Sequence, residues 1–376
     1  MRTTSSSRVW LGAVSTFAAV AFGVAACGGG DGGGGGGGSS SAASGTPVAG
    51  APSWCGSKKI TLALADGFGD NNWRKVTSAE AQQEAKKCPS VTKYIYTDGQ
   101  GNTQKAISDI RGLVAQGVDA MVVFPDAGKA VLPAIRQAYK AGVVTVPYRV
   151  FPGGKAGTDY DYFIKTDFKK AGVLWANWLV KALDGKGNVV NLGGPPANSQ
   201  SLDEYAGMQS VLKDHPEIKF IGTTPYNVTN WDPAQTQKVV TAVLAKYPKI
   251  DAFTTDFGAA LQASFGAFKQ AGRQIPAVAT EDANKLSCAF DSSKSSNPGF
   301  KLFTVDSQNW MSRTAVQFAV AKATGGKIPA STEVPQKAFE DSISKEPNPV
   351  TCDKSMPGDA FMSSHLTKPQ QRNALG

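Results

Sequence analysis

Short apolar runs alternate with amphipathic stretches over most of this chain. The first runs cover residues 60–64, 92–96, 120–124 and 143–146. Between them, apolar residues recur at helical spacing in two sets, namely Ile107, Ile110, Leu113 and Val114, and Val131, Leu132, Ile135, Ala138 and Tyr139. Gly117 and Gly142 follow these sets at the positions where a glycine ends a helix. The pattern predicts a βαβα series, which packs as a parallel sheet with helices on both faces.

The series pauses at the Phe-Pro-Gly-Gly-Lys segment, residues 151–155, and then resumes. The second series predicts a helix over about 169–183 and strands at 162–164, 188–192, 219–223, 252–254, 277–280 and 301–305. We therefore expect an α/β protein with two Rossmann-like, doubly wound parallel-sheet lobes, joined by a hinge near residue 150. Trp175 and Trp178 lie inside the helical pattern and are expected in the core. Ligands of such sheets bind beyond the carboxyl ends of the strands, so residues just after each strand are site candidates.

Residues 1–26 have the pattern of a lipoprotein signal peptide. A basic start is followed by an uncharged apolar stretch over 9–26, which ends in the sequence Val-Ala-Ala before Cys27. This ending resembles the lipobox of bacterial lipoproteins, in which the cysteine receives lipid and the bond before it is cut. The alternatives are a retained membrane helix and a cysteine that follows a signal peptide by chance. We expect a lipidated Cys27 that anchors the protein on the outer face of the cell membrane, with lipid as the only membrane contact.

Residues 27–53 are rich in glycine and serine and predict a flexible tether. The glycine run contains GxGxxG matches, but no predicted strand precedes it and no predicted helix follows it, so it is not interpreted as a phosphate-binding loop.

Four cysteines remain once Cys27 is lipidated, an even number suited to disulfides in an oxidising compartment. Four cysteines allow three pairings, and proximity in sequence favours Cys55 with Cys88 and Cys288 with Cys352. A metal site is the weaker interpretation, because the chain has no CxxC spacing and only two histidines. No metal and no cofactor are expected.

The formal charge of +9 comes from 39 basic and 30 acidic residues that are scattered along the chain. Nucleic-acid binders usually gather basic residues on one face or arm, so we expect no nucleic-acid partner. The hydrophobic fraction of 41% excludes a wholly disordered chain.

Several short motifs occur in a fixed order along the predicted lobes. They are Gly117-Val118-Asp119-Ala120, Pro125-Asp126, Ala141-Gly142-Val143, Lys165-Thr166-Asp167, Trp231-Asp232 and Thr255-Asp256. In this order and spacing the chain, from about residue 60 to 326, resembles sugar-type periplasmic binding proteins, the ribose-binding-like branch that serves ABC transporters. The resemblance implies the type I periplasmic binding protein fold. Its lobes would comprise residues 54–150 plus about 308–330, and residues 151–307 plus about 331–376, with the chain crossing between them three times and each disulfide staying within one lobe.

The resemblance also implies a ligand-binding set. Carried over position by position, it comprises Asn71, Trp73, Asp126, Arg149, Asp167, Glu204, Trp231, Asp256, Glu281 and Gln308. Ser307 is the alternative to Gln308 for the family glutamine. The chain departs from the family pattern at Tyr148, Glu204 and Thr255, which stand where the family has Asp, Arg and Asn, so the particular sugar stays open.

General chemistry favours the same residues, because flat aromatic rings stack on the C–H faces of sugars while charged and amide groups bind the hydroxyls. Two alternatives remain: Trp73 could be a core residue, and Asp126 and Asp167 could serve only as helix caps.

Together these features predict a monomeric, non-enzymatic binding protein that captures a sugar or polyol between its lobes and delivers it to an ABC permease. One alternative is a ligand-sensing component that presents its closed form to a receptor. Another is a lipid-anchored glycoside hydrolase that uses the Glu281-Asp282 pair, although adjacent residues after a strand point apart. The chain has no G-x-S-x-G, and His215 and His365 are expected at the surface.

Overall fold

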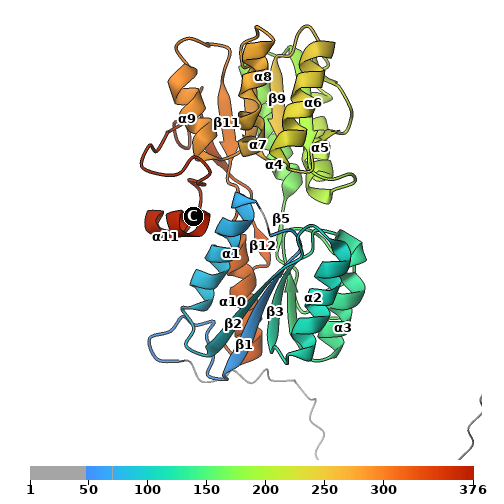
Figure 1. Cartoon of the computed structure of the whole chain (residues 1–376), viewed down its shortest axis with the longest axis vertical. Helices are drawn as coiled ribbons and strands as arrows, with labels where there is room; N and C mark the ends of the chain where they lie inside the picture. The colour runs from blue at the N-terminus through green and yellow to red at the C-terminus, as the bar shows by residue number, and fades with distance from the viewer. Residues whose placement is uncertain (1–47, 70) are drawn as a thin grey trace, which may run out of the picture. The chain divides into compact units, whose positions relative to one another are not determined.

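The computed structural model describes residues 48–69 and 71–376, so the expected signal peptide, Cys27 and most of the tether lie outside the described residues. The first lobe contains a parallel sheet with the strand order β2-β1-β3-β4 (Figure 1). Its strands are β1 (Ile60–Asp66), β2 (Val91–Asp98), β3 (Ala120–Phe124) and β4 (Val144–Pro147). The central strand β3 is buried along its whole length, which explains its continuous apolar sequence.

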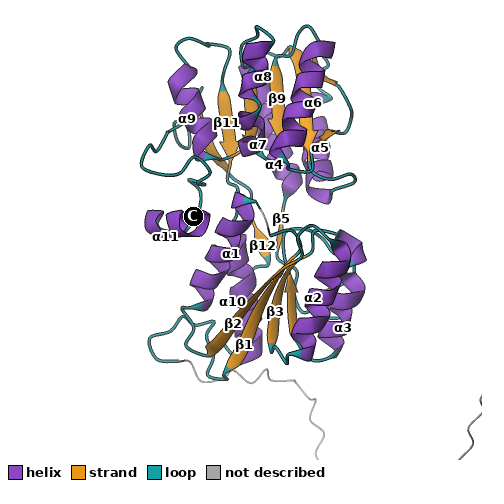
Figure 2. Ribbon diagram, in the orientation of Figure 1, coloured by secondary structure: helices purple, strands orange, loops and turns teal. Residues whose placement is uncertain are grey.

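Helices cover both faces of this sheet (Figure 2). One face packs against α1 (Asn72–Ala85) and α10 (Met311–Thr324), and the other packs against α2 (Thr103–Ala115) and α3 (Leu132–Lys140). Helix α10 comes from the segment at about 308–330, which the resemblance noted above implies for this lobe. The chain therefore leaves the first lobe after β4 and returns to complete it more than 150 residues later.

The second lobe contains a larger sheet with the order β13-β11-β10-β9-β6-β7, and the short β8 also pairs with β6. Its strands are β6 (Gly187–Gly193), β7 (Ile218–Ile221), β8 (Asn227–Val228), β9 (Ala252–Thr255), β10 (Ala277–Glu281), β11 (Leu302–Val305) and β13 (Ala338–Asp341). All pairs are parallel except that of β13, which runs antiparallel to β11 at the edge of the sheet.

Two groups of helices cover the second sheet. Helices α4 (Phe168–Ala182) and α5 (Ser199–Leu212) pack on one face, and α6 (Pro233–Lys246), α7 (Gly258–Ala263), α8 (Phe265–Gln270) and α9 (Asn284–Ser293) pack on the other. Trp175 and Trp178 are buried in α4, as the helical pattern predicted. Helices α1, α2, α4, α5 and α6 each begin after an Asn or Asp whose side chain accepts a backbone N–H, which fixes where these helices start.

The segments that join the lobes pair with one another. Strand β5 (Lys165–Thr166), on the way from the first lobe to the second, is parallel to β12 (Glu333–Val334), on the way back from α10. The strand expected at 162–164 is therefore displaced: within that range only Ile164 pairs, through an isolated bridge to Tyr148. The displacement arises because the pairing partner lies far along the chain, where local sequence gives no sign of it.

The two ends of the folded part differ from the expected boundaries. Val48 and Ala51 already pack against the first-lobe core, although the tether was expected to extend to residue 53. At the other end, residues 331–376 were all expected in the second lobe. Helix α11 (Lys368–Leu375) instead contacts α1 of the first lobe, so the chain crosses between the lobes a fourth time. The α1 side chain Glu80 accepts from the backbone N–H groups of His365 and Leu366, and Leu366 and Leu375 pack with the first-lobe core.

Both disulfides favoured by the sequence are present. Cys55 is joined to Cys88 beside the first sheet, and Cys288 of α9 is joined to Cys352 in the segment after β13. Each bridge links parts of one lobe, so neither restricts the hinge. Among the described residues, no helix combines the length and the apolar character needed to cross a membrane.

Candidate functional site

Side chains from both lobes meet at the carboxyl ends of the strands, next to the hinge. The pocket between them is lined by Asn71, Trp73, Arg74, Phe124, Arg149, Val150, Gln200, Trp231, Asp256, Phe257 and Glu281. Six of the ten residues proposed from sequence lie in this lining. The cavity has a volume of about 40 Å³, enough for a few water molecules, so the two lobes lie close together here.

Trp73 lies in the first turn of α1 and is 6% exposed. Its ring packs edge-on against Phe124, with the ring centroids 5.8 Å apart. Its indole N–H donates to the backbone carbonyl of Ser307, in the hinge segment before α10, over 3.1 Å. Trp73 thus combines core packing with a position at the pocket wall, and its polar edge ties the first lobe to the hinge.

Arg149 follows β4 and connects the lobes directly. One guanidinium nitrogen donates to Glu281 Oε1 at the end of β10, over 2.6 Å, and another donates to the Ser307 carbonyl over 3.2 Å. The guanidinium carbon lies 4.7 Å from the centre of the Trp73 ring, a cation–π arrangement. The backbone of Arg149 has a φ of 64°, in the left-handed region, which is uncommon for a residue other than Gly, Asn or Asp. Such a conformation is typical of functional sites, where the surrounding structure enforces it.

The second-lobe wall is acidic. Gln200 on α5 donates through its amide nitrogen to Glu204 Oε1 and to Glu281 Oε1, each over 3.1 Å. Asp256, which follows β9, accepts a 2.6 Å bond from the Ser201 hydroxyl. Burial raises the pKa of Glu204 and of Asp256, and it raises the pKa of Glu281 to about 8 despite the opposing charge of Arg149.

Trp231 lies on the loop between β8 and α6. Its backbone φ is 56°, and its ring packs so closely on Gly194 that no Cβ would fit at that position. This contact requires a glycine after β6 and fixes the indole beside the cavity. Trp231 is only partly buried, unlike Trp73 on the opposite wall, so its ring presents a free surface to the pocket.

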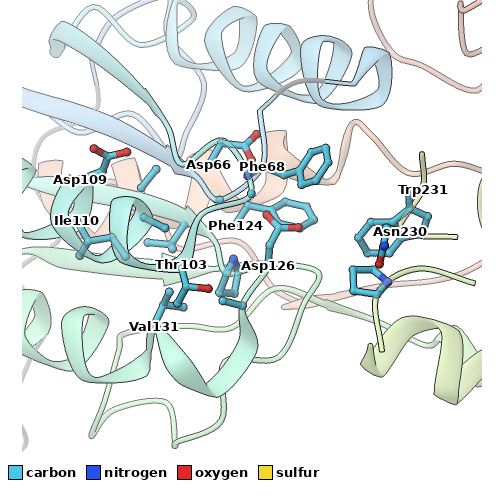
Figure 3. A pocket seen from close by; sticks show the side chains of 18 residues that line it. Asp66, Phe68, Thr103, Asp109, Ile110, Phe124, Asp126, Val131, Asn230 and Trp231 are labelled. Atoms are coloured by element: carbon cyan, nitrogen blue, oxygen red, sulfur yellow. Dashed lines mark hydrogen bonds between the residues drawn. The ribbon is translucent and has the colours of Figure 1, made fainter. Parts of the chain in front are cut away.

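A second cavity adjoins the pocket on the first-lobe side, and the two share Phe124 and Trp231 in their linings. It has a volume of about 330 Å³. Figure 3 shows Trp231 and Asn230 across this space from Phe68, Phe124 and Asp126. This wider cavity lies directly beside the inter-lobe pocket.

Arg74 organises the acidic groups of this wall. It pairs with Asp126, and with Asp66 at 3.3 Å, while its guanidinium carbon lies 3.4 Å from the centre of the Phe124 ring. Burial raises the pKa of Asp126 to about 7, although Arg74 opposes the shift. Asp126 lines the wider cavity rather than the inter-lobe pocket.

Three of the proposed residues lie outside both cavities. Asp167 is exposed and caps α4 by accepting from the Lys170 backbone N–H, which matches the capping alternative. Gln308 is buried in the hinge and donates to the Pro335 carbonyl. Glu204 does not line the pocket itself, but it accepts a hydrogen bond from Gln200, which does.

The sequence analysis missed Arg74, Gln200 and Phe257. Gln200 lies four residues before Glu204 on α5, a spacing that places both side chains on one helix face and could have revealed it. Phe257 directly follows the candidate Asp256. No local pattern marked Arg74, because its role depends on two carboxyl groups from other strands.

The carboxyl pair considered for a hydrolase separates as expected. Glu281 faces Arg149 and Gln200, whereas Asp282 accepts bonds from the Ser307 backbone and from Ser363. The two groups therefore do not flank one space. In the described part of the chain, no three His, Cys, Asp or Glu side chains gather in a way that could hold a metal ion.

The side chains of the pocket suit a polar ring-shaped ligand, which needs the lobes to part because the cavity of about 40 Å³ holds only a few water molecules. Trp73 and Trp231 come from different lobes, and between them the pocket offers a guanidinium, carboxyl groups and amides as hydrogen-bonding partners. Hydrogen bonds to charged groups contribute about 1.5–3 kcal/mol each when water is excluded.

Comparison with known proteins gives a consistent result. A family model described as a periplasmic binding protein domain matches residues 64–327. The D-xylose-binding periplasmic protein of Escherichia coli is 25% identical over 320 residues, which cover 83% of this chain and 92% of that protein. The galactofuranose-binding protein YtfQ of Escherichia coli is 29% identical over 163 residues, 43% of this chain. The matched part spans about half the length of that relative, 51%.

Solved structures show the same two-lobed architecture. A galactofuranose binding protein superposes with a TM-score of 0.64 at 22% identity, covering 74% of this chain and 93% of the other. A myo-inositol binding protein from Caulobacter gives a TM-score of 0.65 at 21% identity, again covering 74% and 93%. At these identities the likeness establishes the fold.

Proposed function

Because this chain belongs to the periplasmic binding protein domain family, we propose that it captures a sugar or polyol between its lobes and delivers it to an ABC import permease. The predicted fold, two α/β lobes of the type I class, is confirmed. The ligand class and the delivery step are the proposal.

The pairing of Arg149 with Glu281 across the hinge carries this proposal. It places a charged hydrogen-bonding group from the first lobe against one from the second, at the point where Trp73 and Trp231 face the same cavity. A ligand at this point contacts both lobes at once, so its binding free energy favours the closed arrangement of the hinge. The names of the relatives, which include xylose-, ribose- and galactofuranose-binding proteins, support a sugar or polyol as that ligand.

The proposed setting is the outer face of the cell membrane. A lipidated Cys27 followed by a glycine-rich tether would keep the binding protein near its permease while leaving the lobes free to close.

A thermal-shift screen of pentoses, hexoses and polyols tests the ligand class. A ligand present at about 100 times its Kd stabilises the folded protein by roughly 2.7 kcal/mol, which raises the Tm by several degrees. The proposal predicts a concentration-dependent rise for at least one compound. A complete panel without any rise would contradict it.

Delivery to a permease and presentation to a receptor both require the lobes to close on the ligand, so the ligand screen does not distinguish these two functions. Deletion of the gene should abolish cellular uptake of the radiolabelled compound identified by the screen, and the wild-type gene should restore it. Unchanged uptake would contradict delivery to a permease.

A further inference from the structure

Carboxyl groups outnumber cationic groups around the two adjoining cavities. The charged side chains that line the two cavities or lie directly behind their lining are Asp66, Arg74, Asp109, Asp126, Arg149, Glu204, Asp256 and Glu281. Six are acidic and two are basic. Lys285, near the outer rim, is already paired with Asp359.

Three of the six carboxyl groups have an arginine partner, and Asp109 pairs with Lys105. Arg74 pairs with Asp66 and Asp126, and Arg149 pairs with Glu281. Within residues 48–69 and 71–376, Glu204 and Asp256 form no salt bridge, although both are at most 4% exposed. Their side-chain bonds come from the neutral donors Gln200 and Ser201, which lie on the same helix as Glu204.

One oxygen of this pair has no partner. Asp256 Oδ1 is buried and accepts no hydrogen bond from the described residues, while Asp256 itself lines the inter-lobe pocket. On the opposite side, Asp66 Oδ2 is likewise buried and unpartnered at the wall of the wider cavity. A buried carboxyl oxygen without a donor is costly, so both walls favour a ligand that brings donors.

Hydroxyl groups alone would supply donors without compensating charge. Burial raises the pKa of Glu204 well above its ordinary value, with the nearby Asp256 and Glu281 adding to the shift. An ammonium group offers three donors and a positive charge, and it favours the ionised form of each carboxyl that it contacts. It therefore relieves both the unsatisfied oxygen and the mutual repulsion of the acidic groups.

We propose that the ligand is a sugar or polyol that carries a protonated amine, such as an amino sugar or an aminocyclitol, with the amine bound by Asp256 and attracted further by the charge of Glu204 behind Gln200. This inference rests on the proposed function, since it names the ligand class of the same pocket. The ring of the ligand lies between the two indoles, and its remaining hydroxyl groups face Arg149 and the first-lobe carboxyl groups.

Matched pairs of compounds test the inference. The pairs are D-glucose with D-glucosamine, D-galactose with D-galactosamine, D-mannose with D-mannosamine, and myo-inositol with an amino-deoxyinositol, and the N-acetyl forms of the amino sugars serve as neutral amides. Thermal shift followed by calorimetry at pH 7 should show at least one amine binding tenfold or more tightly than its hydroxyl and N-acetyl counterparts. Equal or tighter binding of the neutral members overturns the inference and leaves the proposed function standing. Binding of no compound in either class contradicts the proposed function, and the inference falls with it.

Two isosteric variants locate the amine. Glu204→Gln and Asp256→Asn should each reduce the ratio of amine to neutral affinity at least tenfold, whereas Glu217→Gln, at an exposed acid of the same lobe, should leave the ratio unchanged. Lowering the pH from 7 to 5 should also reduce the ratio in the wild type, because the carboxyl groups take up protons as the pH falls. An unchanged ratio in both folded pocket variants would show that the amine, if preferred at all, is held elsewhere and would overturn the assignment.

Discussion

Arg149 links the two lobes directly through hydrogen bonds of its side chain. It follows β4 of the first lobe, donates to Glu281 of the second, and donates to the hinge carbonyl of Ser307. Its left-handed backbone conformation turns the side chain into the pocket at some conformational cost. A residue held in this way both shapes the pocket and ties its wall to the hinge.

Arg149→Ala should weaken binding of the sugar or polyol found in the screen by tenfold or more, about 1.4 kcal/mol. The loss arises because ligand hydroxyl groups lose a charged donor, at about 1–3 kcal/mol. Calorimetric titration measures the change, and circular dichroism checks that the variant is folded. Lys186→Ala, at an exposed ion pair of the second lobe, is the control and should bind like the wild type. If both variants bound the compound with equal affinity, Arg149 would not belong to the ligand-binding site.

Glu204 should make the stability of the ligand-free protein depend on pH. Burial raises its folded-state pKa above the ordinary value of 4.5, so between these two values the folded protein holds a proton that the unfolded chain has released. Stability therefore falls as the pH rises through this window. Glu204→Gln removes the titration, so the variant should gain stability relative to the wild type as the pH rises from 5 to 8. Urea denaturation at both pH values measures the unfolding free energy of the two proteins. A difference in unfolding free energy that is the same at pH 5 and pH 8 would contradict the prediction.

At the scale of elements, α1 connects the pocket to the chain's last segment. Trp73 and Arg74 in its first turn contribute to the pocket, while Glu80, one to two turns further on, binds Arg313 of α10 and the tail backbone at His365 and Leu366. The same helix thus joins the ligand site, the returning helix α10 and the fourth crossing of the chain.

Glu80→Ala should destabilise the protein by about 2–4 kcal/mol, because it removes one carboxylate from a buried guanidinium and three acceptor contacts from the tail. Glu84 still pairs with Arg313, which limits the loss. The exposed pair of Lys186 and Glu217 gives the comparison, since Glu217→Ala should cost about 0–1 kcal/mol. Urea denaturation of both variants at one pH measures the loss of unfolding free energy. Similar losses in Glu80→Ala and Glu217→Ala would show that the contacts of Glu80 have no special structural role.

The local sequence predicted helices and strands correctly where buried apolar residues form a continuous run or recur at a regular spacing. Strand β3 is buried throughout and α3 has a clear apolar stripe, so both were recognisable. The strand expected at 162–164 was displaced, because β5 pairs with residues 333–334. Helix α11 was overlooked in a polar tail, although Thr367 and Gln370 have the spacing of a capping box and form one. Its position against α1 depends on Glu80, which no local pattern links to the tail.

For the candidate site, too, the sequence indicated some residues correctly and could not show features that depend on packing. Trp73, Arg149 and Glu281 were proposed because the family resemblance implies them, and Arg149 and Glu281 also follow predicted strands; the structure places all three around one pocket. Asp167 satisfied the same criterion but caps a helix at the surface. Position along the chain cannot distinguish these cases, because the direction of a side chain depends on the packing of its lobe.

At the scale of the whole molecule, the proposed cycle needs an anchor, a tether and two lobes that close. The expected anchor at Cys27 lies outside the described residues, and neither disulfide links the two lobes. The crossings near the hinge therefore determine how the lobes approach one another.

Cys27→Ser should abolish lipid attachment and leave an unprocessed precursor in the producing cells. The reason is that only a cysteine thiol accepts the lipid whose addition precedes cleavage. Labelling with a radioactive fatty acid and the electrophoretic mobility of the protein measure both effects. Cys55→Ser, which removes a disulfide cysteine and leaves Cys27 intact, should still be labelled. Identical labelling and processing of Cys27→Ser and wild type would contradict the lipoprotein assignment.

The central claim is that a sugar or polyol binds between indoles supplied by the two lobes. Stacking of this kind contributes about 0.5–1.5 kcal/mol beyond the area that it buries, and Trp231 is the partly exposed member of the pair. The most direct measurement is a tryptophan-fluorescence titration with the most stabilising compound of the screen, on wild type, Trp231→Ala and Trp54→Phe, the last a core control outside the pocket lining. We predict a saturable change in wild type and in Trp54→Phe, and a Kd at least tenfold higher in Trp231→Ala. Either an unchanged Kd in Trp231→Ala or the absence of a saturable response in wild type would place the ligand elsewhere and contradict the account.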